Sequence, residues 1–372
     1  MDNMKVALVH DWLTGRRGGE KVLEVLSELF PEAPIFTLIH FPGSQIEKIE
    51  EKRIITSFVQ NMPFLKKKYR SYLPLYPVAT ELFDLRGYDL IISSSHCTAK
   101  GIIPMPDALH ISYIHSPMRY AWNQYFSYFS RERLNIFSRL LIPPIIHCLR
   151  IWDESSSQRV DHFIANSKTV AERIYRYYRR NADVIHPPVD VNFFCPGKQS
   201  DSYYLIVSAL VPYKRIDLAV EAFNRNGDSL NIVGTGPDYK RLKKEAKNNI
   251  KFLGQLSQKE LLHAYQGAKA LIMPGEEDFG INSLESQACG VPVIAYGGGG
   301  AKETVISGLT GIFFDELNAD SLISVLDKFK KLTFNKTEIR KNTLEYSREK
   351  FKHRISLYLE EKWNDFQDKK RK

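Results

Sequence analysis

The strongest constraint on the fold is an alternation of short apolar runs, typical of buried strands, with longer amphipathic stretches, typical of helices. In the first half of the chain the apolar runs lie at 4–10, 35–39, 89–93, 109–114 and 162–165, and helix patterns lie at 20–30 and 168–180. Strands that are apolar on both faces and alternate with helices indicate a parallel sheet covered by helices. The first half therefore predicts an α/β domain.

The same pattern restarts after residues 184–202, a segment with three prolines and a polar run that is a linker by composition. Beyond it, strands are expected at 203–207, 229–233, 251–253, 270–273 and 291–295, and helices at 216–224, 257–268 and 281–289. A chain of 372 residues is also too long for one compact core. Two Rossmann-like domains are the economical prediction.

A last amphipathic pattern, residues 351–366, follows a second domain that already looks complete. We expect this helix to cross back and pack on the first domain. The expected domains are therefore 1–186, joined by a returning helix at 351–372, and 187–350.

Composition indicates which classes of partner and which kinds of site to expect. The net charge of +9 favours anionic ones, such as nucleotide phosphates, nucleic acid or an acidic membrane surface. Four cysteines lie far apart, with no CxxC pair and no histidine at metal-ligand spacing, so no metal site is expected. The N-terminal sequence runs directly into a strand pattern without the features of a signal peptide, which predicts a cytoplasmic location.

Two segments are candidates for membrane contact. The apolar stretch 134–152 is interrupted by charged residues and by Pro143-Pro144, so it predicts either a pair of buried helices or a membrane-contacting face. In the segment 58–70, bulky apolar residues adjoin a run of cations, Lys66, Lys67, Lys68 and Arg70. Such a run rests at an anionic headgroup layer or forms an ordinary solvated basic loop, and the residues alone favour neither.

The segment 274–305 carries most of the chemistry. Glu277 lies in a strand-to-helix loop, and Glu285 follows within the helix, turned away from it around the helix axis. Separated carboxylates suit the vicinal hydroxyls of two different rings better than the acid–base pair of a hydrolase. The amides of Phe279, Gly280 and Ile281 at the helix start would face an anion or sugar oxygens. The alternative is an ordinary loop acid and a helix acid near the N-terminus.

Glycines open two helices. The run Gly297–Gly300 precedes a helix near Lys302, so Gly298, Gly299 and Gly300 are candidates for a phosphate loop, although a flexible turn explains them equally. Gly15, Gly18 and Gly19 repeat the arrangement in the first domain. No site completes GxGxxG, which argues against a dehydrogenase.

Polar side chains also end two predicted strands. Lys214 and Arg215 follow the strand at 203–207, where α/β sheets bind ligands, and paired cations there would neutralise a diphosphate without a metal. His115 follows the strand at 109–114 and would donate to a sugar hydroxyl or be a structural histidine.

Taken together, these segments resemble the family-four retaining glycosyltransferases of GT-B fold. The resemblance is carried by YIHSPMRYAW, FIANSKTV, VIHPPVD, LVPYKR, GTGP, FLGQLS and PGEEDFGINSLESQACGVPVIA, and it covers nearly the whole chain. It implies two Rossmann-like domains with a cleft between them. It is closest to the bacterial mannosyltransferases of O-antigen and exopolysaccharide assembly, which use GDP-mannose as donor.

By that resemblance, Glu277 binds the donor sugar and Glu285 the ribose, Lys214 holds the diphosphate, and His115 contacts the sugar. Gly18 and Gly19 approach the diphosphate, and Glu303 matches the acid that follows the family's second-domain glycines. The family usually has arginine at the position of Ala209, and whether Arg215 compensates stays open. Asp278 adds a carboxylate to the family's acidic motif.

The resemblance therefore implies a hexosyltransferase of polysaccharide biosynthesis that contacts the membrane peripherally. The resemblance implies transfer with retained configuration, no metal or other cofactor, a nucleotide-diphosphate sugar as co-substrate, and a saccharide acceptor linked to lipid at the inner face of the cytoplasmic membrane. A nucleotide-sugar epimerase of similar shape is one alternative. A basic nucleic-acid-binding protein is another, suggested by Lys66–Arg70 and Lys369–Lys372, although no nucleic-acid-binding motif supports it.

Overall fold

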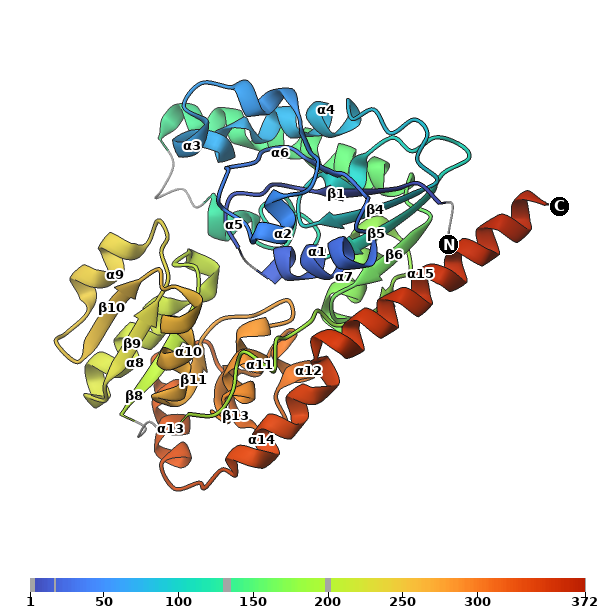
Figure 1. Cartoon of the computed structure of the whole chain (residues 1–372). Coiled ribbons are helices and arrows are strands. Elements are labelled where there is room, and N and C mark those ends of the chain that lie inside the picture. The colour runs from blue at the N-terminus through green and yellow to red at the C-terminus, as the bar shows by residue number, and fades with distance from the viewer. Residues whose placement is uncertain (1–3, 17, 130–134, 198–201, 372) are drawn as a thin grey trace. The chain divides into compact units, whose positions relative to one another are not determined.

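The computed structural model describes residues 4–16, 18–129, 135–197 and 202–371. The chain forms two compact units, each built on its own parallel sheet (Figure 1). Unit 1 runs to Pro187 and resumes at Glu349, and unit 2 is Pro188–Arg348. The sequence-based boundaries, 186/187 and 350/351, differ from these by one or two residues. Leu134, Lys372 and residues 198–201 of the expected linker lie outside the described residues.

Unit 1 contains a seven-stranded parallel sheet in the order β3-β2-β1-β4-β5-β6-β7. Its strands are β1 (Val6–His10), β2 (Ile35–Thr37), β3 (Ile54–Thr56), β4 (Leu90–Ser95), β5 (Leu109–Ile114), β6 (His162–Ala165) and β7 (Asp183–Val184). Its helices are α1 (Gly18–Leu29), α2 (Glu47–Glu50), α3 (Leu65–Lys68), α4 (Tyr76–Glu81), α5 (Tyr125–Tyr128), α6 (Ile136–Ser157) and α7 (Lys168–Tyr178). Every residue of β1, β4 and β5 is buried, as expected for strands covered on both faces.

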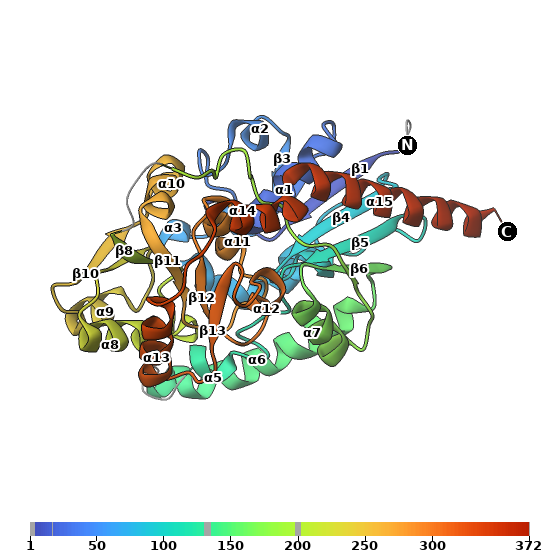
Figure 2. The ribbon, with the colours of Figure 1, turned by 90° about the horizontal axis from the view of Figure 1, so that it is seen from below.

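The C-terminal helix α15 (Arg348–Lys370) belongs to unit 1, as the sequence predicts. Its Phe351, Ile355 and Leu359 are buried in one core cluster with residues of β1, β4, β5 and α1. The contacting residues recur every four positions, the spacing of a single helix face. Figure 2 shows α15 passing α1 and continuing along this unit to the C-terminus.

Unit 2 contains a six-stranded parallel sheet in the order β10-β9-β8-β11-β12-β13. Its strands are β8 (Tyr203–Val207), β9 (Leu230–Val233), β10 (Ile250–Gly254), β11 (Ala268–Met273), β12 (Val293–Tyr296) and β13 (Gly311–Phe314). Its helices are α8 (Ile216–Asn226), α9 (Tyr239–Glu245), α10 (Gln258–Gln266), α11 (Ile281–Ala288), α12 (Ala301–Thr304), α13 (Ala319–Phe329) and α14 (Lys336–Thr343). Both units therefore confirm the predicted pair of Rossmann-like sheets.

Each sheet reverses its strand order once. The reversal lies between β1 and β4 in unit 1 and between β8 and β11 in unit 2. The chain leaves two such neighbouring strands in opposite directions, so a crevice opens at their carboxyl ends, where open α/β sheets bind ligands. These two switch points are the places to look for function.

The apolar stretch from residue 134 is not the pair of buried helices that its prolines indicate. It forms the single helix α6, with Pro143 and Pro144 inside it. Both prolines are exposed, so water can reach the carbonyls that lose an intrahelical partner. Among the described residues, no helix is both long enough and apolar enough to span a bilayer.

Part of the expected linker is also core. Val184 belongs to β7, and Val189, Val191 and Phe194 are buried in a cluster with β8, β11 and α11. The guanidinium of Arg340 binds the carbonyl oxygens of Val191 and Phe194. The prolines suggest a linker, but the apolar residues between them pack on unit 2.

Candidate functional site

The switch point of unit 2 brings together two predicted residues, Lys214 and Glu277. Lys214 ends a short 3-10 helix (Pro212–Lys214) after β8, and Glu277 lies in the loop between β11 and α11. The Lys214 ammonium forms an ion pair and hydrogen bond with Glu277 Oε2. Their side chains are 12% and 18% exposed, so both charges are reachable from solvent but largely desolvated. The pair therefore places a cation and an anion side by side beyond the carboxyl ends of β8 and β11.

Glycine at position 275 allows this approach. A Cβ there would lie 2.8 Å from the carbonyl carbon and oxygen of Lys214 and from the carbonyl oxygen of Tyr213. Backbone atoms cannot yield as a flexible side chain can, so any larger residue would push the acidic loop away from Lys214. The first glycine of the PGEEDFG segment thus has a packing reason that places Glu277 beside Lys214.

The helix α11 begins at this site. Gly280 precedes it with φ of 82°, a left-handed conformation that favours glycine. The Phe279 side chain is buried in the core of unit 2, and Ile281 is the first helical residue. The predicted contact of these residues through backbone amides fits the start of an eight-residue helix, but nothing in the structure tests it.

Glu285 lies deeper in the same helix and does not share the Lys214 pair. It is 3% exposed and accepts a hydrogen bond of 2.9 Å from the Tyr265 hydroxyl on α10. Burial, followed by the Glu285 charge, holds the pKa of Tyr265 well above its usual value, so the phenol keeps its proton. The two glutamates therefore have different partners, as their angular separation around the helix predicts.

The glycine run packs against the acidic loop. A Cβ on Gly299 would lie 2.3 Å from the Glu277 carbonyl oxygen, and one on Gly300 would lie 2.2 Å from that of Asp278. The Gly300 amide donates to the Glu277 carbonyl at 2.8 Å. These glycines thus brace the loop that carries Glu277. The predicted contact of Gly298, Gly299 and Gly300 with a phosphate group is not tested by the structure. Glu303 lies in the short helix α12, and its carbonyl accepts from the Tyr346 hydroxyl.

Arg215 and Ala209 do not take part in the Lys214–Glu277 ion pair. Arg215 has φ of 52° and its Nε lies 3.4 Å from Asp217 Oδ1, with the side chain 35% exposed. Ala209 is exposed in a loop that Gly234 and Gly236 approach within van der Waals distance of backbone. The GTGP segment therefore serves close backbone packing. Whether Arg215 replaces the family's arginine at Ala209 stays untested.

The switch point of unit 1 is organised by a buried carboxylate, Asp11. Its oxygens accept from the amides of residues 96–99 at 2.6 to 2.9 Å, and Oδ2 lies 3.0 Å from His96 Nδ1. Burial alone would raise the pKa of Asp11, but His96 and the amide hydrogen bonds outweigh it, so the pKa falls below its usual range. An ionised Asp11 thus fixes the loop after β4.

Beside this loop lie His115 and the start of α1. A Cβ on Gly19 would lie 3.3 Å from His115 Nε2 and 3.5 Å from His10 Cε1. His115 follows β5, and its Nε2 lies 2.8 Å from Ser94 Oγ on β4. The structure therefore brings together Gly18, Gly19 and His115, which the sequence assigns to the first domain's site.

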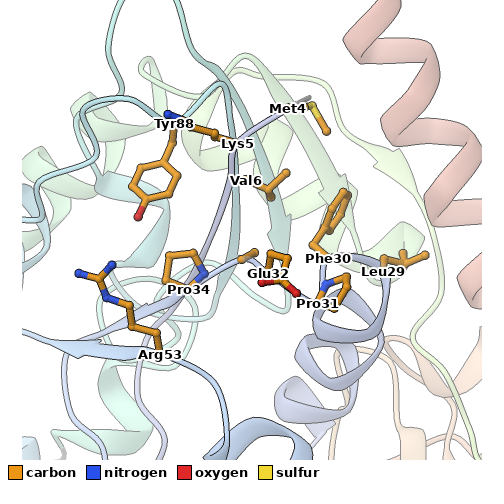
Figure 3. Close-up of a pocket in the computed structure, with 11 residues that line it drawn as sticks. Met4, Lys5, Val6, Leu29, Phe30, Pro31, Glu32, Pro34, Arg53 and Tyr88 are labelled. Atoms are coloured by element: carbon orange, nitrogen blue, oxygen red, sulfur yellow. The ribbon is translucent and has the colours of Figure 1, made fainter. Parts of the chain in front are cut away.

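The described residues contain no cluster of three or more histidine, cysteine, aspartate or glutamate side chains that would hold a metal ion. A separate pocket in unit 1 is lined by Lys5, Glu32, Arg53 and Tyr88 among others (Figure 3). These residues lie at the amino ends of the strands, opposite to the carboxyl ends where the predicted residues lie, so the pocket contributes nothing to that site.

Several residues of both sites escape sequence reasoning. The Tyr265 hydroxyl donates to Glu285, and Asn282 Nδ2 donates to the Val207 carbonyl at the end of β8 at 2.6 Å. In both cases the two partners are distant in sequence. The other missed residues are Asp11, His10 and Ser94. They lie in or next to apolar runs, where a polar residue usually only marks the end of a strand. A polar residue at the end of an apolar run was the available signal.

Comparison with known families decides what these sites belong to. The family model for "Glycosyl transferases group 1" matches residues 192–350, and that for "Glycosyltransferase Family 4" matches residues 16–193. The chain belongs to the glycosyltransferases of GT-B fold. The two matches meet at the boundary between the units and together span both switch points, which agrees with the family that the motifs indicate.

Individual relatives show how far this glycosyltransferase can be compared. An uncharacterized glycosyltransferase of Methanocaldococcus jannaschii is 26% identical over 320 residues, which is 84% of each chain. A GDP-mannose-dependent monoacylated phosphatidylinositol monomannoside mannosyltransferase of Corynebacterium glutamicum is 36% identical over 135 residues, 32% of this chain and 35% of the relative. The chain spans less than half the length of several D-inositol 3-phosphate glycosyltransferases that it matches.

The fold has close solved counterparts. The UDP-glucose complex of Anabaena HepE superposes with a TM-score of 0.71 at 16% identity, covering 96% of this chain and all of that one. At this identity the likeness establishes the fold. It leaves the donor of this glycosyltransferase to be argued from its own residues.

Proposed function

We propose that this chain is a retaining hexosyltransferase that moves a sugar, with mannose from GDP-mannose as the preferred donor, to a saccharide acceptor in cell-surface polysaccharide biosynthesis. The observation that carries the proposal is the Lys214–Glu277 pair at the switch point of unit 2. A cation for the diphosphate and an anion for sugar hydroxyls stand side by side there, and Glu285 lies on the adjoining helix for the ribose.

The preference for GDP-mannose rests on resemblance. The motifs resemble the mannosyltransferases of O-antigen and exopolysaccharide assembly, and the Corynebacterium relative that matches at 36% is named as GDP-mannose-dependent. The UDP-glucose complex of the Anabaena protein supports a nucleotide sugar as the donor class and a different base as the main competitor. Neither an epimerase nor a nucleic-acid-binding protein is favoured by the matched families.

In the proposed reaction the acceptor hydroxyl oxygen forms a bond to the anomeric carbon while the bond from that carbon to the diphosphate oxygen breaks. The acceptor proton passes to the leaving diphosphate on the same face, so the configuration is retained and the nucleoside diphosphate departs. Lys214 and the amides at the start of α11 stabilise the developing charge, Glu277 and His115 orient the sugar, and no protein nucleophile takes part.

We further propose a lipid-linked acceptor met at the inner face of the cytoplasmic membrane. The support is the segment around α3, where Phe64 is 74% exposed and is followed by exposed Lys66, Lys67 and Lys68 and then by exposed Arg70. Leu65–Lys68 form the short helix α3. Leu65 anchors it in the core while the cations face solvent, an arrangement that suits anionic headgroups, each cation being worth about 1 kcal/mol.

Flotation with anionic and neutral liposomes tests the membrane proposal. Anionic vesicles are expected to carry the protein at low salt and release it at high salt, and Lys66→Gln, Lys67→Gln and Lys68→Gln together are expected to weaken binding. The matched control neutralises Lys240, Lys243 and Lys244 on or beside α9 of unit 2. Equal loss in both triple variants, or no binding at low salt, contradicts the proposal.

The donor is tested by titrating GDP-mannose, UDP-glucose and ADP-glucose and by measuring hexose transfer with and without a membrane extract as acceptor. A ligand bound to the native state raises the melting temperature by mass action. The largest shift is expected with GDP-mannose, and product is expected only when acceptor is present. Product without acceptor would indicate an epimerase, and a preference for UDP-glucose would overturn the mannose assignment alone.

A further inference from the structure

A chain of hydrogen-bonding groups crosses the switch point of unit 1. His10 ends β1 and Ser94 lies opposite it in register on β4, and His115 follows β5. His10 Nδ1 lies 3.1 Å from Ser94 Oγ, and the same oxygen lies 2.8 Å from His115 Nε2. His10 is 1% exposed and Ser94 is fully buried. One hydroxyl therefore links a buried imidazole to the histidine assigned to the donor sugar.

Donor and acceptor in these two hydrogen bonds can be assigned from the surroundings of each ring nitrogen. Of the two ring nitrogens of His10, Nδ1 lies beside Ser94 Oγ, and Nε2 is buried with no hydrogen-bond partner among the described residues. A proton on Nε2 would be a buried N–H without an acceptor, so the proton belongs on Nδ1, the nitrogen that faces Ser94. Ser94 Oγ then accepts from Nδ1–H and has its own proton left to donate to His115 Nε2. An unpaired imidazole lone pair at His10 Nε2 is also less costly than an unpaired N–H.

His10 stays neutral in this arrangement. Burial lowers the pKa of His10 to about 4, with the charge of nearby His96 lowering it further and that of Asp11 raising it. The other titratable neighbour, His96, lies with its ring 6.3 Å from that of His10 and is bound to Asp11. Gly19, in the first turn of α1, adjoins both histidines, and the positive end of that helix also disfavours an imidazolium beside it.

We propose that His10 is a positioning residue that, through Ser94, fixes His115 as the tautomer protonated on Nδ1. His115 Nε2 accepts from Ser94, which leaves Nδ1–H as the ring's only donor. If His115 meets the donor sugar, as the proposed function has it, that donor is the group it presents to a sugar oxygen. The tautomer itself is a property of unit 1 and does not depend on the identity of the donor.

The tautomer is measured by ¹⁵N–¹H correlation spectroscopy of ring-labelled full-length protein at about pH 8.5, where an ordinary histidine is neutral. The wild type is expected to show a protonated Nδ1 and an unprotonated Nε2 at His115. In Ser94→Ala the Nε2 signal is expected to shift toward the protonated position, because the Ser94 hydroxyl no longer donates to it. An Nε2–H tautomer in the wild type overturns the proposal.

The neighbouring serine provides a matched control. Ser93 is also fully buried on β4, but successive side chains point to opposite faces, and its hydroxyl lies 2.9 Å from His110 Nε2. Ser93→Ala is expected to alter the signals of His110 and leave those of His115 unchanged. Equal disturbance of His115 by both variants would show a general loosening of the strand. It would overturn the proposed relay, which is the hydrogen-bonded series from His10 through Ser94 to His115.

Kinetics separate positioning from structure. His10→Phe removes the N–H but keeps a ring, whereas His10→Asn keeps a donor on the atom attached to Cγ. We expect His10→Phe to lower kcat about fivefold to tenfold, the effect of one weakened hydrogen bond, and His10→Asn to restore most of it. Equal loss in both variants overturns the relay. A normal relay with full activity in His115→Ala would instead contradict the assigned role of His115 in sugar transfer.

Discussion

The two switch points have the same place in their sheets and opposite chemistry. In unit 2 the strand ends carry Lys214 and Glu277, charged side chains that are 12% and 18% exposed. In unit 1 they carry His10 and Ser94, which are uncharged and buried. The carboxylate of neighbouring Asp11 is bound by backbone amides. The topology creates a crevice in both cases, and the residues decide what it can bind. In the proposed function, the charged residues of unit 2 hold the diphosphate and the neutral ones of unit 1 face sugar hydroxyl groups.

The difference predicts that unit 1 is far less tolerant of substitution at its strand ends. Asp11→Asn is expected to lower the free energy of unfolding by about 3 kcal/mol, because an amide nitrogen would face backbone N–H groups that now bind a carboxylate. Denaturant unfolding measures this. Asp107→Asn, at an exposed position, is the control and is expected to change stability by less than about 0.5 kcal/mol. Equal values would remove the contrast between the units.

The buried histidines give unit 1 a pH dependence. The pKa of His10 is about 4 in the folded chain against 6.5 for the free side chain, so the unfolded chain binds more protons between these values. Stability is therefore complete above about pH 6.5 and is lost as pH falls toward 4, by up to about 3 kcal/mol for this group. His110, with a pKa of about 3 for the same reason of burial, adds to the loss.

Unfolding curves of the wild type and His10→Phe between pH 7 and pH 4 check the sign and size. The variant is expected to lose less stability over this window because one titrating group is gone. Identical slopes would mean that the folded and unfolded chains protonate His10 equally over this range, which would also undermine the proton arrangement proposed for Ser94.

At the unit 2 site the expected effect is on binding. Lys214→Ala and Glu285→Ala are each expected to weaken affinity for the nucleotide sugar by roughly 1.5–3 kcal/mol, because each removes a hydrogen bond to or from a charged group. Glu285→Gln keeps an acceptor for Tyr265 and separates lost binding from lost packing. Calorimetric titration measures the affinities, with Arg215→Ala as a comparison for the more exposed cation. Wild-type affinity in both alanine variants would remove the donor site from unit 2.

The same contrast explains what the sequence reveals. Apolar runs predict ten of the thirteen strands in the described part of the chain, because strands buried on both faces cannot be polar, and they miss the short strands β3, β7 and β13. The single helix α6 was missed because exposed Pro143 and Pro144 are tolerated where water reaches the backbone, and the packing of Val189 and Phe194 was missed because the prolines dominate that segment. Local composition reports propensity, and tertiary packing overrides it in both places.

The sites divide in the same way. Lys214, Glu277 and Glu285 were selected as candidates because charged residues beside apolar runs stand out. Their pairing was not found, because it depends on β8 and β11 being neighbours, which only the strand order shows. His10 and Ser94 lie 84 residues apart and carry no charge, so no sequence pattern links them. A neutral buried network is visible only once β1 and β4 lie side by side.

The smallest expected effect concerns metal ions. Transfer activity is expected to survive an excess of EDTA, because the Lys214 ammonium and the amides at the start of α11 supply positive charge where the diphosphate would leave, and no Asp-x-Asp motif occurs in the sequence. Initial rates with EDTA, and with EDTA followed by excess Mg²⁺ or Mn²⁺, measure this. A loss that either ion restores would contradict a metal-free reaction. It would also weaken the contrast between the two switch points, because the charge at the leaving group would then come from an ion bound with the donor rather than from the side chains that distinguish unit 2.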